Sequence, residues 1–183
     1  MTTVIEHSHK DHANLARLLN LVGEEIDEAK QDGKRGFFVL EHVMRYITSY
    51  LDQAHHHKED AIFRRVASLD PLAISAIDEL TLEHEKLTSA GRELYDLVYA
   101  AQNSDFVRRE DVISKGTDYV KTLRAHFSKE IDLLSRARWL LSEQDLREID
   151  AEVESINDPL FGDTVEKEYQ SLYAYIMAQQ EES

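Results

Sequence analysis

Four long stretches of the chain carry apolar residues at three- and four-residue spacing, which is the period of an α-helix. They cover about residues 4–30, 37–67, 77–98 and 106–141. Only 6 glycines and 2 prolines interrupt the 183 residues, and no stretch shows the period-two alternation of a strand. The sequence therefore predicts an all-α fold.

Turn signals fall between these stretches. Gly33 suits a left-handed cap at the end of the first helix. Asp70 is a good helix cap and Pro71 a good first-turn residue. The polar run at 103–105 ends the third helix. These breaks predict four long helices joined by short connections.

The C-terminal part of the chain has signals of its own. Ser142 and Asp145 predict the start of a shorter helix that reaches about Ile156, and a last helix covers about 164–180. We find no low-complexity segment or linker. We therefore expect a single domain over 1–183, with the bundle at about 4–141 and a helical extension at about 142–180.

Composition excludes several classes of function. The chain has no cysteine, so disulfides, iron–sulfur clusters and thiolate sites are ruled out, and any metal must be held by nitrogen and oxygen. The net charge of −15 disfavours binding to nucleic acid or anionic membranes. No apolar run is long enough to span a membrane, and the polar N-terminus does not resemble a secretory signal. We expect a cytoplasmic protein.

Each of the four apolar stripes contains a histidine near its middle, and two of them add a glutamate four residues later. Residues four apart lie on the same face of a helix, so each pair can present an imidazole and a carboxylate to one point. The residues are His12 on the first stripe, His55 and Glu59 on the second, His84 on the third, and His126 and Glu130 on the fourth.

The spacing of these residues shows an internal repeat. His12 and His55 are 43 residues apart, and His84 and His126 are 42 apart. The local sequence repeats weakly as well, because Asp11-His12-x-x-Leu15 resembles Glu83-His84-x-x-Leu87. Two antiparallel helical hairpins would bring the two units together in the middle of a bundle, as in known dinuclear carboxylate sites.

Bound cations explain this pattern better than a structural role does. An ionised glutamate buried in a core costs several kcal/mol unless it is paired or binds a metal. A single histidine on an apolar stripe is usually an ordinary core residue, but four at repeated spacing are improbable by chance. Four further histidines, which lie off the stripes or near the N-terminus, are assigned no metal role: His7, His9, His42 and His57.

The segments DHANLARLL, YLDQAHHHKEDAIF, LEHEKL and HFSKE resemble the hemerythrin-like, or HHE cation-binding, family. The HHxKED core, together with LSEQDLREID and DPLFG, resembles one bacterial branch of it. The resemblance implies an up-down-up-down four-helix bundle with a non-haem di-iron centre, in which two iron ions share an oxide or hydroxide bridge. It places the ligands at His12, His55, Glu59, His84, His126 and Glu130.

The chain also departs from the oxygen-carrying members of that family. They have a second histidine one turn on in the third helix, where this chain has Thr88, and they end in His-x4-Asp instead of His-x3-Glu. Four imidazoles, two bridging carboxylates and one bridging oxide leave two positions open on two six-coordinate irons. His56 is a candidate fifth imidazole, although on a regular helix it points about 100° away from His55.

These observations predict a di-iron protein that binds or reacts with dioxygen, peroxide or nitric oxide, for sensing or detoxification. Tyr119, seven residues before His126, is a candidate hydrogen-bond donor to a bound oxygen species, or an ordinary core tyrosine. Two alternatives remain: an iron carrier that repairs damaged clusters, and a structural metal site in an interaction protein. The sequence leaves zinc or manganese occupancy, the physiological ligand, enzymatic turnover and the oligomeric state open.

Overall fold

The computed structural model describes residues 3–32, 37–103, 106–153 and 157–181, and these residues form helices and turns but no strand. The all-α prediction is confirmed. The elements are α1 (Val4–Asp32), α2 (Phe38–Tyr46), η1 (Ile47–His55), α3 (His56–Leu69), η2 (Pro71–Ala73), α4 (Ile74–Asn103), α5 (Arg109–Leu140), α6 (Glu143–Glu152), η3 (Lys167–Tyr169) and α7 (Gln170–Glu181).

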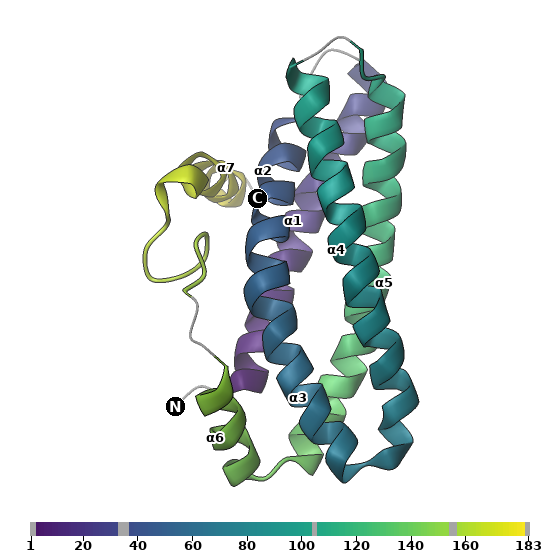
Figure 1. Ribbon diagram of the computed structural model, residues 1–183. Coiled ribbons are helices and arrows are strands. Elements are labelled where there is room, and N and C mark those ends of the chain that lie inside the picture. The colour runs from purple at the N-terminus through teal and green to yellow at the C-terminus, as the bar shows by residue number, and fades with distance from the viewer. Residues whose placement is uncertain (1–2, 33–36, 104–105, 154–156, 182–183) are drawn as a thin grey trace.

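Four long rods lie side by side and alternate in direction (Figure 1). They are α1, the continuous rod α2–η1–α3, α4 and α5. Both α1 and α4 pack along α5, and α2 packs against α1 and α4. This arrangement is the predicted up-down-up-down bundle. The short helix α6 lies beside its lower end, and α7 lies against α2.

The core has two apolar clusters with a polar layer between them. The larger cluster, with Leu19 and Val98, fills the half of the bundle where α1 and α4 end. The smaller cluster, with Ile62 and Leu134, fills the other half. The buried histidines and glutamates fall between the residues of these two clusters on every rod.

The second rod differs from the regular helix expected over 37–67. Its central part, η1, is a π-helix, which has a wider turn than an α-helix. At its start, the hydroxyl of Thr48 donates to the Met44 carbonyl at 2.8 Å, and that of Ser49 donates to the Arg45 carbonyl at 2.8 Å. These hydroxyls supply donors to backbone carbonyls where the α-helical hydrogen-bond pattern changes.

Two predicted caps are confirmed. The side chain of Asp70 accepts from the backbone N–H of Leu72 at 3.0 Å, with Pro71 next to it. Ser142 and Asp145 form a reciprocal capping box at the start of α6. Polar side chains therefore satisfy free backbone N–H groups where α3 gives way to η2 and where α6 begins.

Several predicted boundaries were wrong by a few residues. The fourth long helix begins at Arg109 and not at Phe106. The last helix begins at Gln170, because a short 3₁₀ turn at 167–169 precedes it. The helix α6 ends at Glu152. Its predicted end at Ile156, the cap at Gly33 and the break at 104–105 lie outside the described residues.

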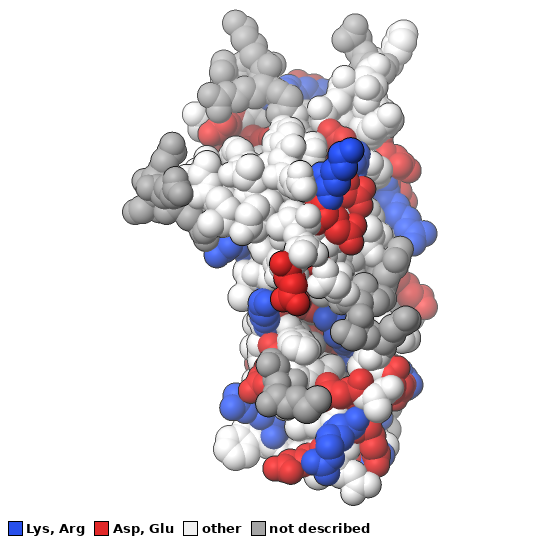
Figure 2. Space-filling view, turned by 90° about the vertical axis from the view of Figure 1, so that its left-hand side faces the viewer, with Lys and Arg blue, Asp and Glu red and all other residues white. Residues whose placement is uncertain are grey.

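None of the helices that the structure describes has a segment long and apolar enough to cross a membrane. Figure 2 looks at the side of the molecule that carries α6 and α7. Acidic and basic side chains are interspersed over the lower part of this face, and a larger uncharged area lies above them. The net charge of −15 is therefore not gathered into one acidic patch on this side.

Candidate metal centre

The structure brings the six predicted ligands together in the polar layer of the bundle. Each long rod contributes at least one of them, and all are buried. Glu59 and Glu130 have no exposed surface. The ligands are His12 on α1, His55 at the end of η1, Glu59 on α3, His84 on α4, and His126 and Glu130 on α5.

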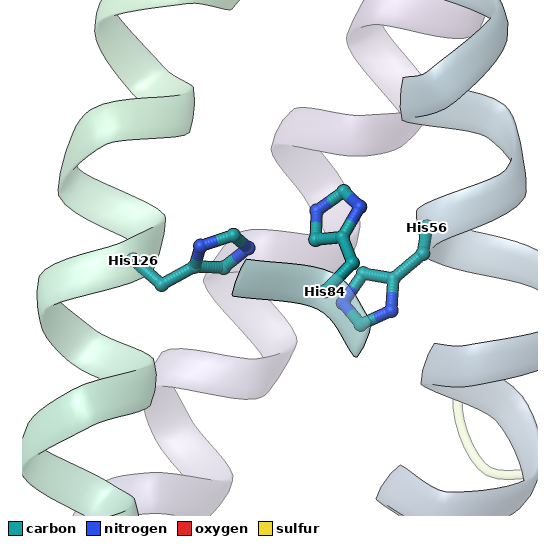
Figure 3. A group of neighbouring side chains, drawn as sticks. All are labelled: His56, His84 and His126. Carbon is teal, nitrogen blue, oxygen red and sulfur yellow. The ribbon is translucent and has the colours of Figure 1, made fainter. Parts of the chain in front are cut away.

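The candidate ligand atoms form two neighbouring groups. In one group, His56, His84 and His126 converge from three different rods (Figure 3). The other group contains His12, His55, Glu59 and Glu130. Within each group the ligand atoms lie within 4.8 Å of one another. Two groups side by side suit a pair of ions.

His56 faces the site, unlike the orientation expected for a regular helix. Its ring stacks on that of His84, with centroids 4.1 Å apart and an angle of 15° between the planes. His56 directly follows η1, and the wider π-helical turn lets the adjacent His55 and His56 both face inward. The structure therefore offers a fifth imidazole.

A sequence signal for this π-helix was present but was missed. On the second rod the inward stripe runs 47-51-55-59, which is three successive steps of four. Each step of four drifts by about 40° on a regular α-helix, so the stripe would turn away from the core. The third and fourth stripes alternate steps of three and four and need no such correction.

Glu130 lies between the two groups. One carboxylate oxygen is 2.8 Å from Nε2 of His84 and 2.9 Å from Nε2 of His126. The other oxygen is 3.1 Å from Nε2 of His12. Burial alone raises the pKa of this carboxyl, but hydrogen bonds from the three imidazoles lower it well below its ordinary value. Glu130 is thus held as an anion in contact with both groups.

Glu59 has a different environment. Its oxygens are 3.3 Å from Nε2 of His12 and 3.4 Å from Nε2 of His55, both in the same group. Burial and the charge of Glu130 raise the pKa of Glu59 well above its ordinary value. Without a cation, this carboxyl therefore tends to be protonated.

Three of the imidazoles are oriented by carboxylates on their outer side. Nδ1 of His55 is 3.2 Å from Asp11, Nδ1 of His84 is 3.2 Å from Asp60, and Nδ1 of His126 is 2.9 Å from Glu83. An Nδ1–H that donates to a carboxylate directs Nε2 at the site, where a bound metal would take the place of any proton on Nε2. This carboxylate–histidine arrangement is typical of metal-binding histidines.

Sequence reasoning missed the role of these carboxylates, although the repeat contained the signal. Asp11 and Glu83 each precede a ligand histidine, yet each orients the histidine of the next rod. A lysine then neutralises each of them. Lys58 is 2.7 Å from Asp11, and Lys129 is 2.6 Å from Glu83, and each lysine is three residues after the histidine concerned.

Buried polar atoms without a partner show that the residues fit a cation. Within the described residues, both carboxylate oxygens of Glu59 and Nε2 of His55 are buried and have no hydrogen-bond partner. Such atoms are expensive to leave unsatisfied. A metal ion bound by nitrogen and oxygen would satisfy them, and imidazole with carboxylate suits iron, zinc or manganese.

Tyr119 lies near the site but two helical turns away from His126 on α5. A side chain at Gly91 on α4 would place its Cβ 3.0 Å from the Tyr119 hydroxyl, so the small residue makes room for the ring. Tyr119 and His126 both line a groove of about 440 Å³ between α4 and α5. The contact of Tyr119 with a bound oxygen species stays a prediction.

The four histidines that were assigned no metal role lie outside the two groups. His7 and His57 are exposed. Nδ1 of His42 donates to the Phe38 carbonyl at 2.9 Å, which is a local bond within its own helix. His9 is partly buried near the start of α1.

Fold and site together define a helical-bundle protein with a buried, cation-binding cluster of histidine and glutamate. Comparison with known proteins agrees, because the sequence model of the hemerythrin HHE cation-binding domain matches residues 3–137. The chain belongs to the hemerythrin HHE family. Comparison with curated proteins and with solved structures gave no match. The matched segment contains every candidate ligand, whereas α6 and α7 lie beyond it.

Proposed function

We propose that this chain is a hemerythrin-like di-iron protein that binds or reacts with dioxygen, peroxide or nitric oxide, in sensing or detoxification. One observation carries the proposal. Five imidazoles converge on two buried carboxylates, and three of the imidazoles are turned inward by carboxylates behind them. An iron pair held by nitrogen and oxygen supplies the chemistry of binding or reducing these small ligands.

Each residue has a definite task in this proposal. His56, His84 and His126 would hold one iron, and His12 and His55 would hold the other. Glu130 would bridge them, since its two oxygens already face both groups. Glu59 would be the second bridging carboxylate, as expected from the sequence. The two anions offset part of the positive charge of the ions.

The fifth imidazole changes the expected number of open positions. Five imidazoles, two bridging carboxylates and one bridging oxide would leave one coordination position open on two six-coordinate irons. That position would belong to the ion held by His12 and His55, which has two imidazoles where the other has three. The ring of Phe127 lies on this side, 4.8 Å from His12 and 6.4 Å from His55. An apolar ring next to this position excludes water without providing a ligand.

Burial of the ligands favours a resident centre over an iron carrier. Every candidate ligand residue is at most 6% exposed, and these residues come from all four rods of the bundle. A carrier must release its ion readily, and this arrangement provides no exposed ligand to start an exchange. The open position argues against a purely structural site, because structural metal sites have their coordination filled by the protein.

Metal analysis with spectroscopy tests the proposal. We expect two iron ions per chain in protein purified under iron-replete conditions, and an absorption spectrum that changes when azide is added. The variant His84→Ala should lower the iron content, and His57→Ala, which removes an exposed histidine, should not. A ratio of one or zero irons per chain, or a spectrum insensitive to azide, would contradict the proposal.

A further inference from the structure

The C-terminal extension lies beyond the matched family segment and packs on the second rod. Four of its side chains are buried in the larger apolar cluster, namely Leu160, Tyr169, Leu172 and Ile176. It is seated against α2 and η1, a region that precedes the two adjacent histidines of the site. The extension is therefore placed where it can affect the ligands.

The first polar contact joins Tyr169 to the start of the π-helix. The hydroxyl of Tyr169 is 2.8 Å from that of Ser49, which already donates its proton to the Arg45 carbonyl at 2.8 Å. Tyr169 must then be the donor, and Ser49 the acceptor. The bond holds the Ser49 hydroxyl in the orientation that caps a carbonyl at the beginning of η1.

The second polar contact joins Asp158 to Tyr46, the residue before η1. The Tyr46 hydroxyl donates to Asp158 at 3.1 Å. Burial, followed by the nearby Asp158 charge, raises the pKa of Tyr46, so that it stays a donor. The rings of Tyr46 and Tyr169 also meet edge to face, with centroids 5.9 Å apart.

Hydrogen bonds within the loop hold Asp158 in position. The other carboxylate oxygen of Asp158 accepts from the N–H groups of Leu160 and Phe161 at 2.9 Å each. The backbone N–H of Gly162 donates to the Asp158 carbonyl at 3.0 Å. Any larger residue at position 162 would place its Cβ only 2.3 Å from the Asp158 carbonyl oxygen, which explains the glycine of the DPLFG segment.

We propose that the C-terminal extension sets the register of the second rod, with Tyr169 and Asp158 as positioning residues that keep η1 π-helical and thereby keep His56 facing the site. This inference deepens the proposed function and rests on it for the identity of the ions. A π-helical turn is rare and has to be stabilised by its surroundings. If η1 relaxes to an α-helix, which has fewer residues per turn, the part of the rod after η1 rotates about its axis and His56 turns away from the site.

The test uses the full-length chain and three conservative variants. Tyr169→Phe removes the hydroxyl that contacts Ser49, and Tyr46→Phe removes the one that contacts Asp158, but both keep their rings. Tyr173→Phe is the matched control, because this tyrosine lies four residues after Tyr169, on α7, and is 37% exposed. Circular dichroism checks that all variants keep the helical fold.

Cobalt(II) titration of metal-free protein, followed by visible absorption, measures affinity without relying on activity. We expect Tyr169→Phe and Tyr46→Phe each to weaken binding of one of the two ions by about tenfold, the range found when residues that orient ligands are removed. Tyr173→Phe should bind as the parent protein does. Equal affinities in all three variants would overturn the inference.

A double-mutant cycle with His56→Ala separates positioning from general destabilisation. If Tyr169 acts through His56, adding Tyr169→Phe to His56→Ala should weaken cobalt binding no further. If the two effects add, the inference is wrong. Hydrogen exchange of the η1 amides in metal-free protein gives a second, metal-independent measurement, and it should be faster in Tyr169→Phe than in Tyr173→Phe.

The outcomes also separate this inference from the proposed function. A parent protein that binds two cobalt ions but no iron contradicts the proposed function alone. If the parent protein binds two iron ions and both affinity and η1 exchange are unaffected by Tyr169→Phe, only the inference fails.

Discussion

The two hairpins of the bundle use the same ligand plan and differ in a few residues. The first hairpin comprises α1 and the rod α2–η1–α3, and the second comprises α4 and α5. Each contributes an acid followed by histidine on its first rod, and then a histidine, a lysine and a glutamate on its second. In each, the acid orients the second histidine and pairs with the lysine.

The first difference is the residue that follows the second histidine of each hairpin. His56 follows His55 in the first hairpin, whereas Phe127 follows His126 in the second. The two rings occupy corresponding places, since His56 stacks on His84 and Phe127 lies 4.8 Å from His12. The repeated arrangement therefore builds the two candidate groups, and this one difference gives three imidazoles to one group and two to the other.

A second difference concerns the residue after each glutamate. Asp60 follows Glu59 and orients His84, whereas Ile131 follows Glu130. Nδ1 of His12 is accordingly buried without a hydrogen-bond partner in the described part of the chain. His84 is fixed from both sides, and hydrogen bonds to Asp60 and Glu130 outweigh burial and raise its pKa to about 9 in the absence of metal.

The largest effect is expected where the two hairpins meet, at Glu130. We predict that Glu130→Ala loses most of the metal from both sites, because this carboxylate contacts imidazoles of both groups. Glu59→Ala should also lower the metal content, but less than Glu130→Ala, because in the metal-free structure the Glu59 oxygens lie beside only His12 and His55, at 3.3 and 3.4 Å. Elemental analysis measures both.

Glu85→Ala is the control for these variants, because Glu85 is exposed and adjoins His84 in sequence. It should keep full metal content. Full occupancy in Glu130→Ala would show that this residue does not bridge the two sites.

The next prediction removes the difference between the hairpins. Phe127→His should supply a sixth imidazole on the side of His12 and His55 and fill the open position. The protein should then keep two ions but lose its spectral response to azide. Phe127→Leu, which keeps an apolar side chain, should retain the response, and azide binding by the histidine variant would mean that the open position lies elsewhere.

Removal of the acids that orient the histidines should lower metal affinity by an intermediate amount, and by a similar amount in both hairpins. Asp11→Ala and Glu83→Ala each leave an imidazole and a lysine without their carboxylate. We expect metal affinity to fall by about 10- to 100-fold in each variant, as is usual for such partners. Competition with a chelator of known affinity measures the loss. A loss in one variant alone would show that Asp11 and Glu83 do not have equivalent roles in the two hairpins.

The smallest effect is expected for Asp60→Ala. Asp60 is more exposed than the other orienting acids, with 38% of its side chain accessible, so solvent weakens its interaction with His84. We expect a loss of affinity of only a few-fold, confined to the group of His84. A loss as large as that of Glu83→Ala would indicate that water does not compensate for the missing carboxylate.

The sequence predicted the four rods and the six ligands because both follow from helical periodicity. Burial of an apolar stripe depends only on spacing, and His12, His84 and the two His-x3-Glu pairs lie on such stripes. The position of His56 could not follow from regular spacing, since it depends on the π-helical turn of η1. The single-domain prediction over 1–183 stays a prediction.

Side-chain contacts between different rods were the other feature that could not be predicted from the sequence. Asp11 and Glu83 each hydrogen-bond a histidine that is distant in sequence, at separations of 44 and 43 residues. Local pattern identifies which face of a helix is inward, but not which side chain of a neighbouring helix meets it. The same limit hid the contact of Tyr169 with Ser49, which are separated by 120 residues.

The burial of the candidate ligands has a consequence for how the proposed centre would acquire its metal. Residues that are at most 6% exposed would not exchange an ion with solvent one bond at a time while the rods stay packed. Loading and loss then both require the bundle to open, so they occur on the timescale of folding and local unfolding. Imidazole and carboxylate select weakly among divalent ions at equilibrium. In the proposed centre, the metal available when the chain folds would therefore be the metal that it keeps.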